Sequence, residues 1–233
     1  MTLLELVQDI LNDMDSDEVS SITDTEEASQ VASIVKSSYY KLIDLRDDWP
    51  FLRTLTTLTG LADTANPTKM LIPSAMTKVE WVKYNKKDVT YLDPKAFKDV
   101  LDTRTEATGV VDANGYILNA DPIYWTSYDQ EYIWFDGYDS DTESTLQTAN
   151  STAYGIVTPT WTHTNAFIPT LPSKMFSGLL ADAKGTAFLT LKQQANAKEE
   201  DYAQKSFKRF QTTSWRNRQA EPKTNDGVNY GRK

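Results

Sequence analysis

The hydrophobic residues of this chain change their spacing twice, and this change limits the folds that the chain can adopt. At both ends of the sequence they recur every three or four residues, which predicts amphipathic helices. Between about residues 51 and 167 they form short runs rich in Thr, Val, Ile, Tyr and Trp, separated by turn residues, which predicts strands. Since a lone amphipathic helix cannot bury its apolar stripe, we expect the terminal helices to pack together.

This pattern predicts an α+β protein. We expect an antiparallel helical bundle from the N- and C-terminal segments, with an inserted β-sandwich or barrel-like domain and an extended C-terminal tail. The bundle domain would comprise residues 1–52 and 171–218, the β-domain residues 53–170 and the tail residues 219–233. With 233 residues, the chain is long enough to bury a substantial core.

Three motifs predict where helices begin. Thr2 with Glu5, and Thr23 with Glu26, have the spacing of a capping box, in which side chain and backbone satisfy each other's hydrogen bonds. Asp93–Pro94 has the pattern of an N-cap followed by proline at the first helical position. We therefore expect two helices before residue 50 and a short one after residue 93.

A returning helix is predicted after Leu171–Pro172, continuing to about Trp215. Gly178 and Gly185 lie in its interior, where each glycine costs about 1 kcal/mol relative to alanine. Because both glycines lie on one side of the helix, they predict the close approach of another helix.

The middle segment contains seven candidate strands. Two of them flank Asp129–Gln130 and predict a tight hairpin. The candidates are Arg53–Thr59, Thr77–Tyr84, Val89–Leu92, Tyr116–Leu118, Ile123–Tyr128, Glu131–Phe135 and Thr160–Phe167.

The net charge of −9 is distributed unevenly along the chain. Residues 1–48 carry −9, residues 49–171 carry −6 and residues 202–233 carry +6. A chain with an acidic start and a basic end can steer different partners, or copies of itself, to its two ends. Solubility with a basic tail is the simpler interpretation of the same numbers.

The sequence offers little for catalysis. It has no cysteine, and its single histidine, His163, has no neighbouring pattern of a catalytic triad. No glycine-rich phosphate loop is present. We therefore expect no enzymatic activity, no cofactor and no metal. We also expect no signal peptide and no membrane span, because the chain lacks a basic N-terminal region and a long apolar run.

Aromatic and acidic residues gather between residues 124 and 143. Trp125 and Trp134 could stack on sugar rings, which suggests a β-module that binds or cleaves glycans as an alternative function. The alternation Asp139–x–Asp141–x–Glu143 resembles the start of a calcium loop but lacks its turn glycine and final glutamate. The simpler interpretation is that half of these aromatics form the inner face of a hairpin.

Several stretches resemble the tail tubular protein A family, the head-to-tail adaptors (gatekeeper-type connectors) of short-tailed bacteriophages. The opening Leu6–Asn12, the step Asp48–Trp49–Pro50–Phe51, the segment Tyr128–Asp136 and the run Ile168–Pro172 are similar to family patterns, in the same order. Together they cover about a third of the chain.

The resemblance implies a structural virion protein at the head–tail junction, assembled in the host cytoplasm. Its partners would be the portal protein, the tail nozzle protein and further copies of itself in a ring, usually of twelve subunits. DNA would pass through the ring during ejection without specific binding, and no membrane would be involved. The expected portal or inter-subunit contacts are Trp215, Arg216, Arg218, Asn229, Tyr230, Arg232 and Lys233, since aromatic residues and arginine are favoured at interfaces.

Overall fold

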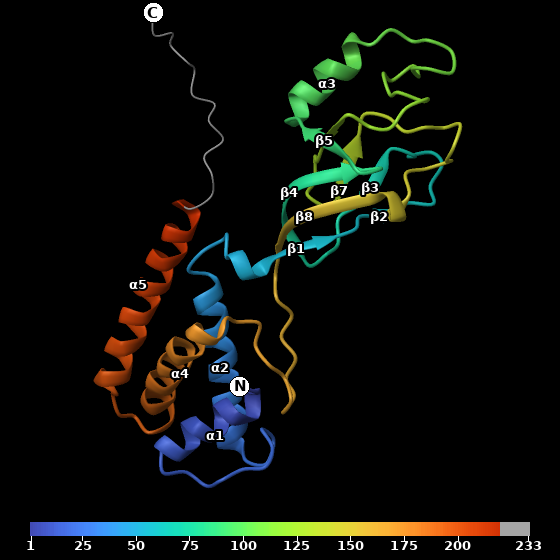
Figure 1. Ribbon diagram of the computed structural model, residues 1–233. Coiled ribbons are helices and arrows are strands. Elements are labelled where there is room, and N and C mark those ends of the chain that lie inside the picture. The colour runs from blue at the N-terminus through green and yellow to red at the C-terminus, as the bar shows by residue number, and fades with distance from the viewer. Residues whose placement is uncertain (220–233) are drawn as a thin grey trace, which may run out of the picture. The chain divides into compact units, whose positions relative to one another are not determined.

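The computed structural model of the chain describes residues 1–219 and, of these, the side chains of residues 1–212. The chain divides into two compact units, one formed by Met1–Phe51 with the residues from Trp161 onward, the other by Leu52–Thr160. The first unit holds four α-helices: α1 (Leu3–Asp13), α2 (Glu26–Ile43), α4 (Phe176–Leu191) and α5 (Ala197–Gln219) (Figure 1). The second holds the β-sheet and α3 (Pro94–Thr103).

The start of α1 is confirmed and the start of α2 is shifted. The Thr2 hydroxyl accepts from the Glu5 backbone N–H at 3.2 Å, and Glu5 accepts from the Thr2 backbone at 2.7 Å, so both halves of the capping box form. The N-cap of α2 is Thr25 rather than Thr23, and its hydroxyl accepts from the backbone N–H of Ala28 at 3.0 Å. The predicted box at Thr23 is therefore wrong by two residues.

Helix α4 lies between α2 and α5 and contacts both (Figure 1). The two glycines of α4 permit this packing. A Cβ added at Gly178 would lie 2.7 Å from the Phe210 ring, and one at Gly185 would lie 3.1 Å from Cγ of Glu200. The predicted close approach of another helix is thus confirmed, and that helix is α5.

Three ion pairs, made by two α4 side chains, join α4 to the N-terminal helices. Lys184 contacts Asp13 at 2.6 Å and Asp9 at 3.3 Å on α1, while Asp182 accepts from Lys41 of α2 at 2.6 Å. Both α4 side chains are buried. Burial lowers the pKa of Lys184, but its contacts with the two α1 carboxylates outweigh burial and raise it overall. Lys184 therefore stays charged at neutral pH.

The returning helix is interrupted, a point that its sequence pattern, which runs to about Trp215, leaves open near Asn196. Helix α4 ends at Leu191, Gln193 has a positive φ of 54°, and α5 begins at Ala197. Asn196 precedes α5, and its carbonyl accepts from the backbone N–H of Glu200 at 3.1 Å. The interruption allows α5 to turn back along α4.

The segment between the sheet and α4 belongs to the helical unit. The backbone N–H of Leu3 donates to the Phe167 carbonyl at 2.7 Å, and that of Ile22 donates to the Asn165 side chain at 3.1 Å. These bonds direct the segment to the N-terminal helices, so the predicted strand Thr160–Phe167 is wrong.

Eight strands form one curled mixed sheet in the order β1-β8-β4-β5-β6-β7-β3-β2. Neighbouring strands are antiparallel except β5 and β6, which are parallel. Figure 1 shows β8 beside β4 in this sheet. The strands are β1 (Arg53–Thr56), β2 (Thr59–Gly60), β3 (Lys69–Leu71), β4 (Met76–Tyr84), β5 (Lys87–Tyr91), β6 (Tyr124–Thr126), β7 (Tyr132–Phe135) and β8 (Ser151–Val157).

The predicted fold class, a helical bundle with an inserted β-sandwich or barrel-like domain, is therefore wrong. Within residues 1–219 the largest element is a single curled mixed sheet, open like half a barrel, and the same residues form five α-helices. One of these helices, α3, contacts β6 in the sheet unit. The sequence pattern locates strands, but it does not reveal the parallel pairing of β5 with β6, which depends on contacts between distant segments. The predicted tail, residues 219–233, lies outside the described residues except for Gln219, the last residue of α5.

Strand β8 lies between two partner strands, next to the edge strand β1, yet no strand is predicted there from the sequence. It pairs with β1 on one side and β4 on the other, and its first half contains Ser, Thr and Ala rather than alternating large apolar residues. Gly155 is required there because a Cβ would lie 2.0 Å from the Lys78 carbonyl oxygen on β4. The candidate strand Tyr116–Leu118 is also wrong, since Ile117 makes only isolated bridges.

Two hairpins flank the parallel pair. Strands β4 and β5 are joined by Asn85 and Lys86, which both have positive φ, the geometry of a type I′ turn. The predicted hairpin around Asp129–Gln130 forms between β6 and β7, but its connection is longer than a tight turn. There the Asp129 carboxylate accepts from the backbone N–H groups of Glu131 and Tyr132.

Replacing Gly155 by alanine should separate β8 from β4, because the new methyl group collides with the backbone at Lys78. We expect Gly155→Ala to lower the free energy of unfolding by about 1–3 kcal/mol, measured by urea denaturation. Thr90→Ala, at an exposed position of β5, is the control and should change it by about 0.5 kcal/mol or less. Equal stability of the two variants would show that β8 does not pack this closely.

Candidate functional site

The helical unit contains an open aromatic groove of about 570 Å³. Its walls come from the segment after α2, the turn before α4 and the middle of α5. We use the name aromatic groove for the hollow lined by Trp49, Phe51, Met175, Tyr202, Arg209 and Phe210. Tyr202 is half-exposed, so part of this apolar surface is open to solvent.

The position of Trp49 is fixed by the end of α2. Its indole N–H donates to the Ile43 carbonyl at 2.8 Å, and Arg46 lies over its ring at 5.4 Å from the centroid. Phe51 packs beside Trp49 with ring centroids 5.5 Å apart. This wall of the aromatic groove is therefore rigidly built.

Two exposed cations, Lys174 and Arg209, also line the aromatic groove. Within the described residues neither makes an ion pair. The arrangement of apolar rings beside unpaired cations favours a ligand that is apolar with acidic groups at its edge.

The sheet unit contains a second hollow, of about 540 Å³. It lies among the loop before β3, the end of α3, the loop after α3 and strand β7. We use the name tyrosine pocket for the hollow lined by Asn66, Asn114, Tyr116, Tyr128, Trp134 and Tyr138. Its volume is within the range of roughly 300–1,000 Å³ that is typical of small-molecule sites.

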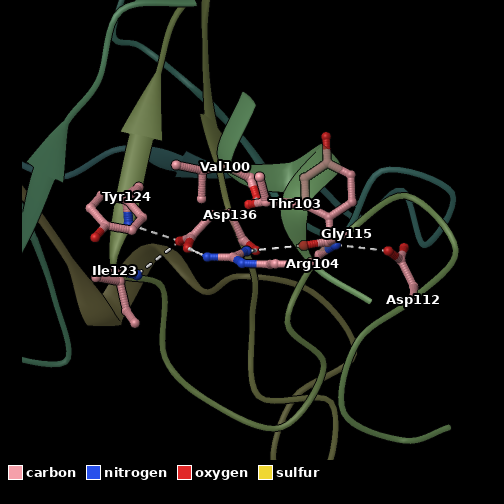
Figure 2. Close-up of polar contacts among 9 residues, drawn as sticks. Val100, Thr103, Arg104, Asp112, Gly115, Ile123, Tyr124 and Asp136 are labelled. Atoms are coloured by element: carbon pink, nitrogen blue, oxygen red, sulfur yellow. Dashed lines mark hydrogen bonds and ion pairs between the residues drawn. The ribbon is translucent and has the colours of Figure 1, made fainter. Parts of the chain in front are cut away.

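A buried ion pair holds one wall of the tyrosine pocket in place. The Arg104 guanidinium, at the end of α3, donates to an Asp136 carboxylate oxygen at 2.6 Å and to the Gly115 carbonyl at 3.0 Å. The other Asp136 carboxylate oxygen accepts from the backbone N–H groups of Ile123 and Tyr124, each at 2.8 Å. Figure 2 shows Arg104 between Asp136 and Gly115.

The loop after α3 passes very close to the helix at Gly115. This residue has a φ of +85°, and a Cβ there would lie 2.1 Å from the Leu101 carbonyl oxygen. Asp112 closes the turn by accepting from the backbone N–H groups of Asn114 and Tyr116, at 2.9 and 2.8 Å. The turn presents the side chains of Asn114 and Tyr116 to the pocket.

The tyrosine hydroxyls of the pocket are available to a ligand. Those of Tyr116, Tyr128 and Tyr138 make no hydrogen bond to any described residue. Burial, followed by the nearby Tyr128 and Asp112, raises the pKa of Tyr116 to about 12. Tyr116 therefore remains protonated at neutral pH and can both donate and accept.

The structure separates the two tryptophans that the sequence suggested as one glycan surface. Trp125 pairs with Phe135 across β6 and β7 and is buried in the core of the sheet. Trp134 is the neighbour of Phe135, so it points to the opposite face and lines the tyrosine pocket. Tyr128 meets its ring edge-on at 5.7 Å, and Lys69 lies 4.2 Å from its centroid.

The acidic residues between 129 and 143 have separate structural tasks. Asp136 holds Arg104, and Glu143 accepts from the Tyr84 hydroxyl at 2.5 Å. Burial raises the pKa of Glu143, although this hydrogen bond opposes the shift. Among the described residues no group of three or more His, Asp or Glu side chains could hold a metal ion.

The residues predicted to contact the portal or a neighbouring subunit lie in the last part of α5 or beyond it. Trp215, Arg216 and Arg218 are in α5, but their side chains are outside the described part of the chain. Asn229, Tyr230, Arg232 and Lys233 lie outside the described residues altogether.

No protein-family model and no curated protein matches this sequence. None of the helices within residues 1–219 is both long enough and apolar enough to span a bilayer.

Sequence reasoning missed Arg104 and Tyr116, whereas Tyr138 belongs to the group of aromatic residues that it considered for sugar stacking. The turn pattern Asp112–Ala–Asn–Gly115 could have located the loop that carries Tyr116, since Asp, Asn and Gly favour turns. Nothing in the local sequence links Arg104 to Asp136.

Removing the Arg104 cation should leave the Asp136 carboxylate buried without its charge partner. We expect Arg104→Met to lower the free energy of unfolding by about 3–5 kcal/mol, and Arg104→Lys by less, because lysine keeps the charge. Urea denaturation followed by tryptophan fluorescence measures both. Lys95→Met breaks an exposed ion pair with Asp99 on the same helix and should leave the midpoint almost unchanged. If Arg104→Met and Lys95→Met lowered the free energy of unfolding by similar amounts, the Arg104–Asp136 ion pair would not have the structural role assigned to it here.

Proposed function

We propose that this chain is a structural head-to-tail adaptor of a short-tailed bacteriophage. In this proposal it assembles as a ring between the portal and the tail nozzle, surrounds the path of the DNA and catalyses no reaction. It belongs at the head–tail junction of the virion and acts by protein–protein contact.

One observation carries the proposal. Two of the stretches that resemble the adaptor family are far apart in the sequence, yet both line the aromatic groove. Trp49, Pro50 and Phe51 come from one stretch and Pro172 comes from the other. A shared surface supports the interpretation that these stretches serve one task, the docking of a partner.

The groove has the properties of a protein interface. Half-exposed Tyr202 and the partly buried Phe210 supply aromatic anchor surface, and Arg209 supplies a cation. We therefore assign the groove to a segment of the portal protein that carries apolar and acidic side chains.

Charge reversal in the aromatic groove should prevent this docking. We expect Arg209→Glu to reduce binding to portal rings at least about tenfold, because it replaces an attraction by a repulsion. Cosedimentation of the full-length chain with purified portal rings measures it. Lys208→Glu is the matched control: it makes the same charge change one residue earlier on α5, at an exposed position outside the groove.

Two results would contradict the proposal. Equal weakening by Arg209→Glu and Lys208→Glu would show that net charge, rather than the groove, governs binding. A wild-type chain that sediments separately from portal rings would remove the adaptor role itself.

The tail provides an independent test of the same proposal. Removing Gly227–Lys233 should leave a folded protein, because these mostly polar residues lie beyond α5, the last helix of the described residues. Heads assembled with the truncated chain should lose DNA or lack tails, as counted by electron microscopy. Normal particles would show that the tail does not contact the portal.

A further inference from the structure

We infer that the tyrosine pocket of the sheet unit binds a neutral saccharide. This binding site is separate from the aromatic groove, and it does not depend on the adaptor role.

The pocket supplies the ring surfaces that sugars require. The C–H faces of a pyranose ring pack against aromatic rings, and four aromatic side chains line this one pocket. Tyr128 is 51 % exposed, so its ring is open to a ligand. Trp134 is held in a fixed orientation by Tyr128 and Lys69, which makes it a rigid platform.

The pocket also supplies hydrogen-bonding groups that lack partners. The hydroxyls of Tyr116, Tyr128 and Tyr138 and the side-chain amide of Asn114 make no hydrogen bond to any described residue. Each of these groups can donate and accept, as can a sugar hydroxyl. A saccharide would pack its C–H faces against the rings and form hydrogen bonds with the polar groups, whereas a purely apolar ligand would leave the polar groups unpaired.

The charges of the pocket favour a neutral ligand. Lys98 is the one cation among the described lining residues, and it is already paired with Asp102. Lys69 does not line the pocket, and its ammonium lies over the rings of Tyr132 and Trp134. Single-stranded nucleic acid stacks on similar rings, but it also needs cations along its phosphates. The pocket therefore favours a neutral sugar over a nucleic acid or an acidic sugar.

The carboxyl groups among the lining residues indicate that the pocket binds a saccharide without cleaving it. A glycosidase uses two carboxyl groups on either side of the scissile bond. Asp112 is the one carboxylate among the described residues that line the pocket, and one of its oxygens already accepts from two backbone N–H groups. The pocket can hold a saccharide, but it lacks the second carboxyl group for hydrolysis.

The pocket wall is preformed. The Arg104–Asp136 ion pair and the close approach at Gly115 fix the loop that carries Asn114 and Tyr116. A ligand would therefore not have to order this loop, which lowers the entropic cost of binding.

Isothermal titration of the full-length chain with maltotetraose, cellotetraose and chitotetraose tests the inference. We expect at least one of these neutral sugars to bind with a Kd of about 1 mM or lower. Tyr128→Ala and Asn114→Ala should each weaken this binding, Tyr128→Ala by at least about tenfold. Both positions are exposed, so both variants should fold.

Tyr91→Ala is the matched control, because Tyr91 is 53 % exposed in the same unit but lies outside the tyrosine pocket. It should bind the sugar as the unaltered chain does. The inference is overturned if none of the three sugars binds at about 10 mM, or if Tyr91→Ala weakens binding as much as Tyr128→Ala. It is also overturned if oligothymidylate binds in a Tyr128-dependent way while the sugars do not. None of these results would affect portal binding through the aromatic groove.

Discussion

The buried pairing of Arg104 with Asp136 is the interaction on which the sheet unit most depends. The Asp136 carboxylate accepts from the guanidinium at the end of α3 and from two backbone N–H groups at the start of β6, and the same guanidinium donates to the Gly115 carbonyl. A charge buried in this way is stable only while all of its partners are present. This contact also determines the shape of the tyrosine pocket, because the lining residues Asn114 and Tyr116 are the two chain neighbours of Gly115, whose carbonyl accepts from Arg104.

The helical unit is organised by polar and steric contacts made along α4. Lys184 and Asp182 lie on different sides of one turn of this helix and pair with α1 and α2, while Gly178 and Gly185 allow α5 to approach. Because these two side chains pair with different helices, a rotation of α4 about its axis would break the ion pairs with α1 and with α2. The aromatic groove depends on this arrangement because the N-terminal end of α4 and the middle of α5 form its walls.

Sequence reasoning succeeded where the determinants are local. The capping box of Thr2 and the N-cap at Asp93 depend on residues three positions apart, and both form as predicted. It misplaced one local cap, at Thr23 instead of Thr25, and otherwise failed where the determinants lie far apart in the sequence. Strand β8 owes its place to two partner strands rather than to its own composition, and Trp134 could be separated from Trp125 only once the pairing of β6 with β7 was known. In the tyrosine pocket, the turn at Asp112–Gly115 could be recognised from the sequence, but the ion pair between Arg104 and Asp136 could not.

The position of β8 also affects how the protein emerges from the ribosome. Strand β1 has β8 as its single partner in the described sheet, and β8 is the last strand of the chain to be synthesised. During translation β1 and the free side of β4 must therefore remain unpaired until β8, the last strand of the described sheet, has been made. Unpaired strand edges are prone to aggregate. Exposed charged residues, such as Lys78 on β4, would help to keep the nascent chain soluble during this interval.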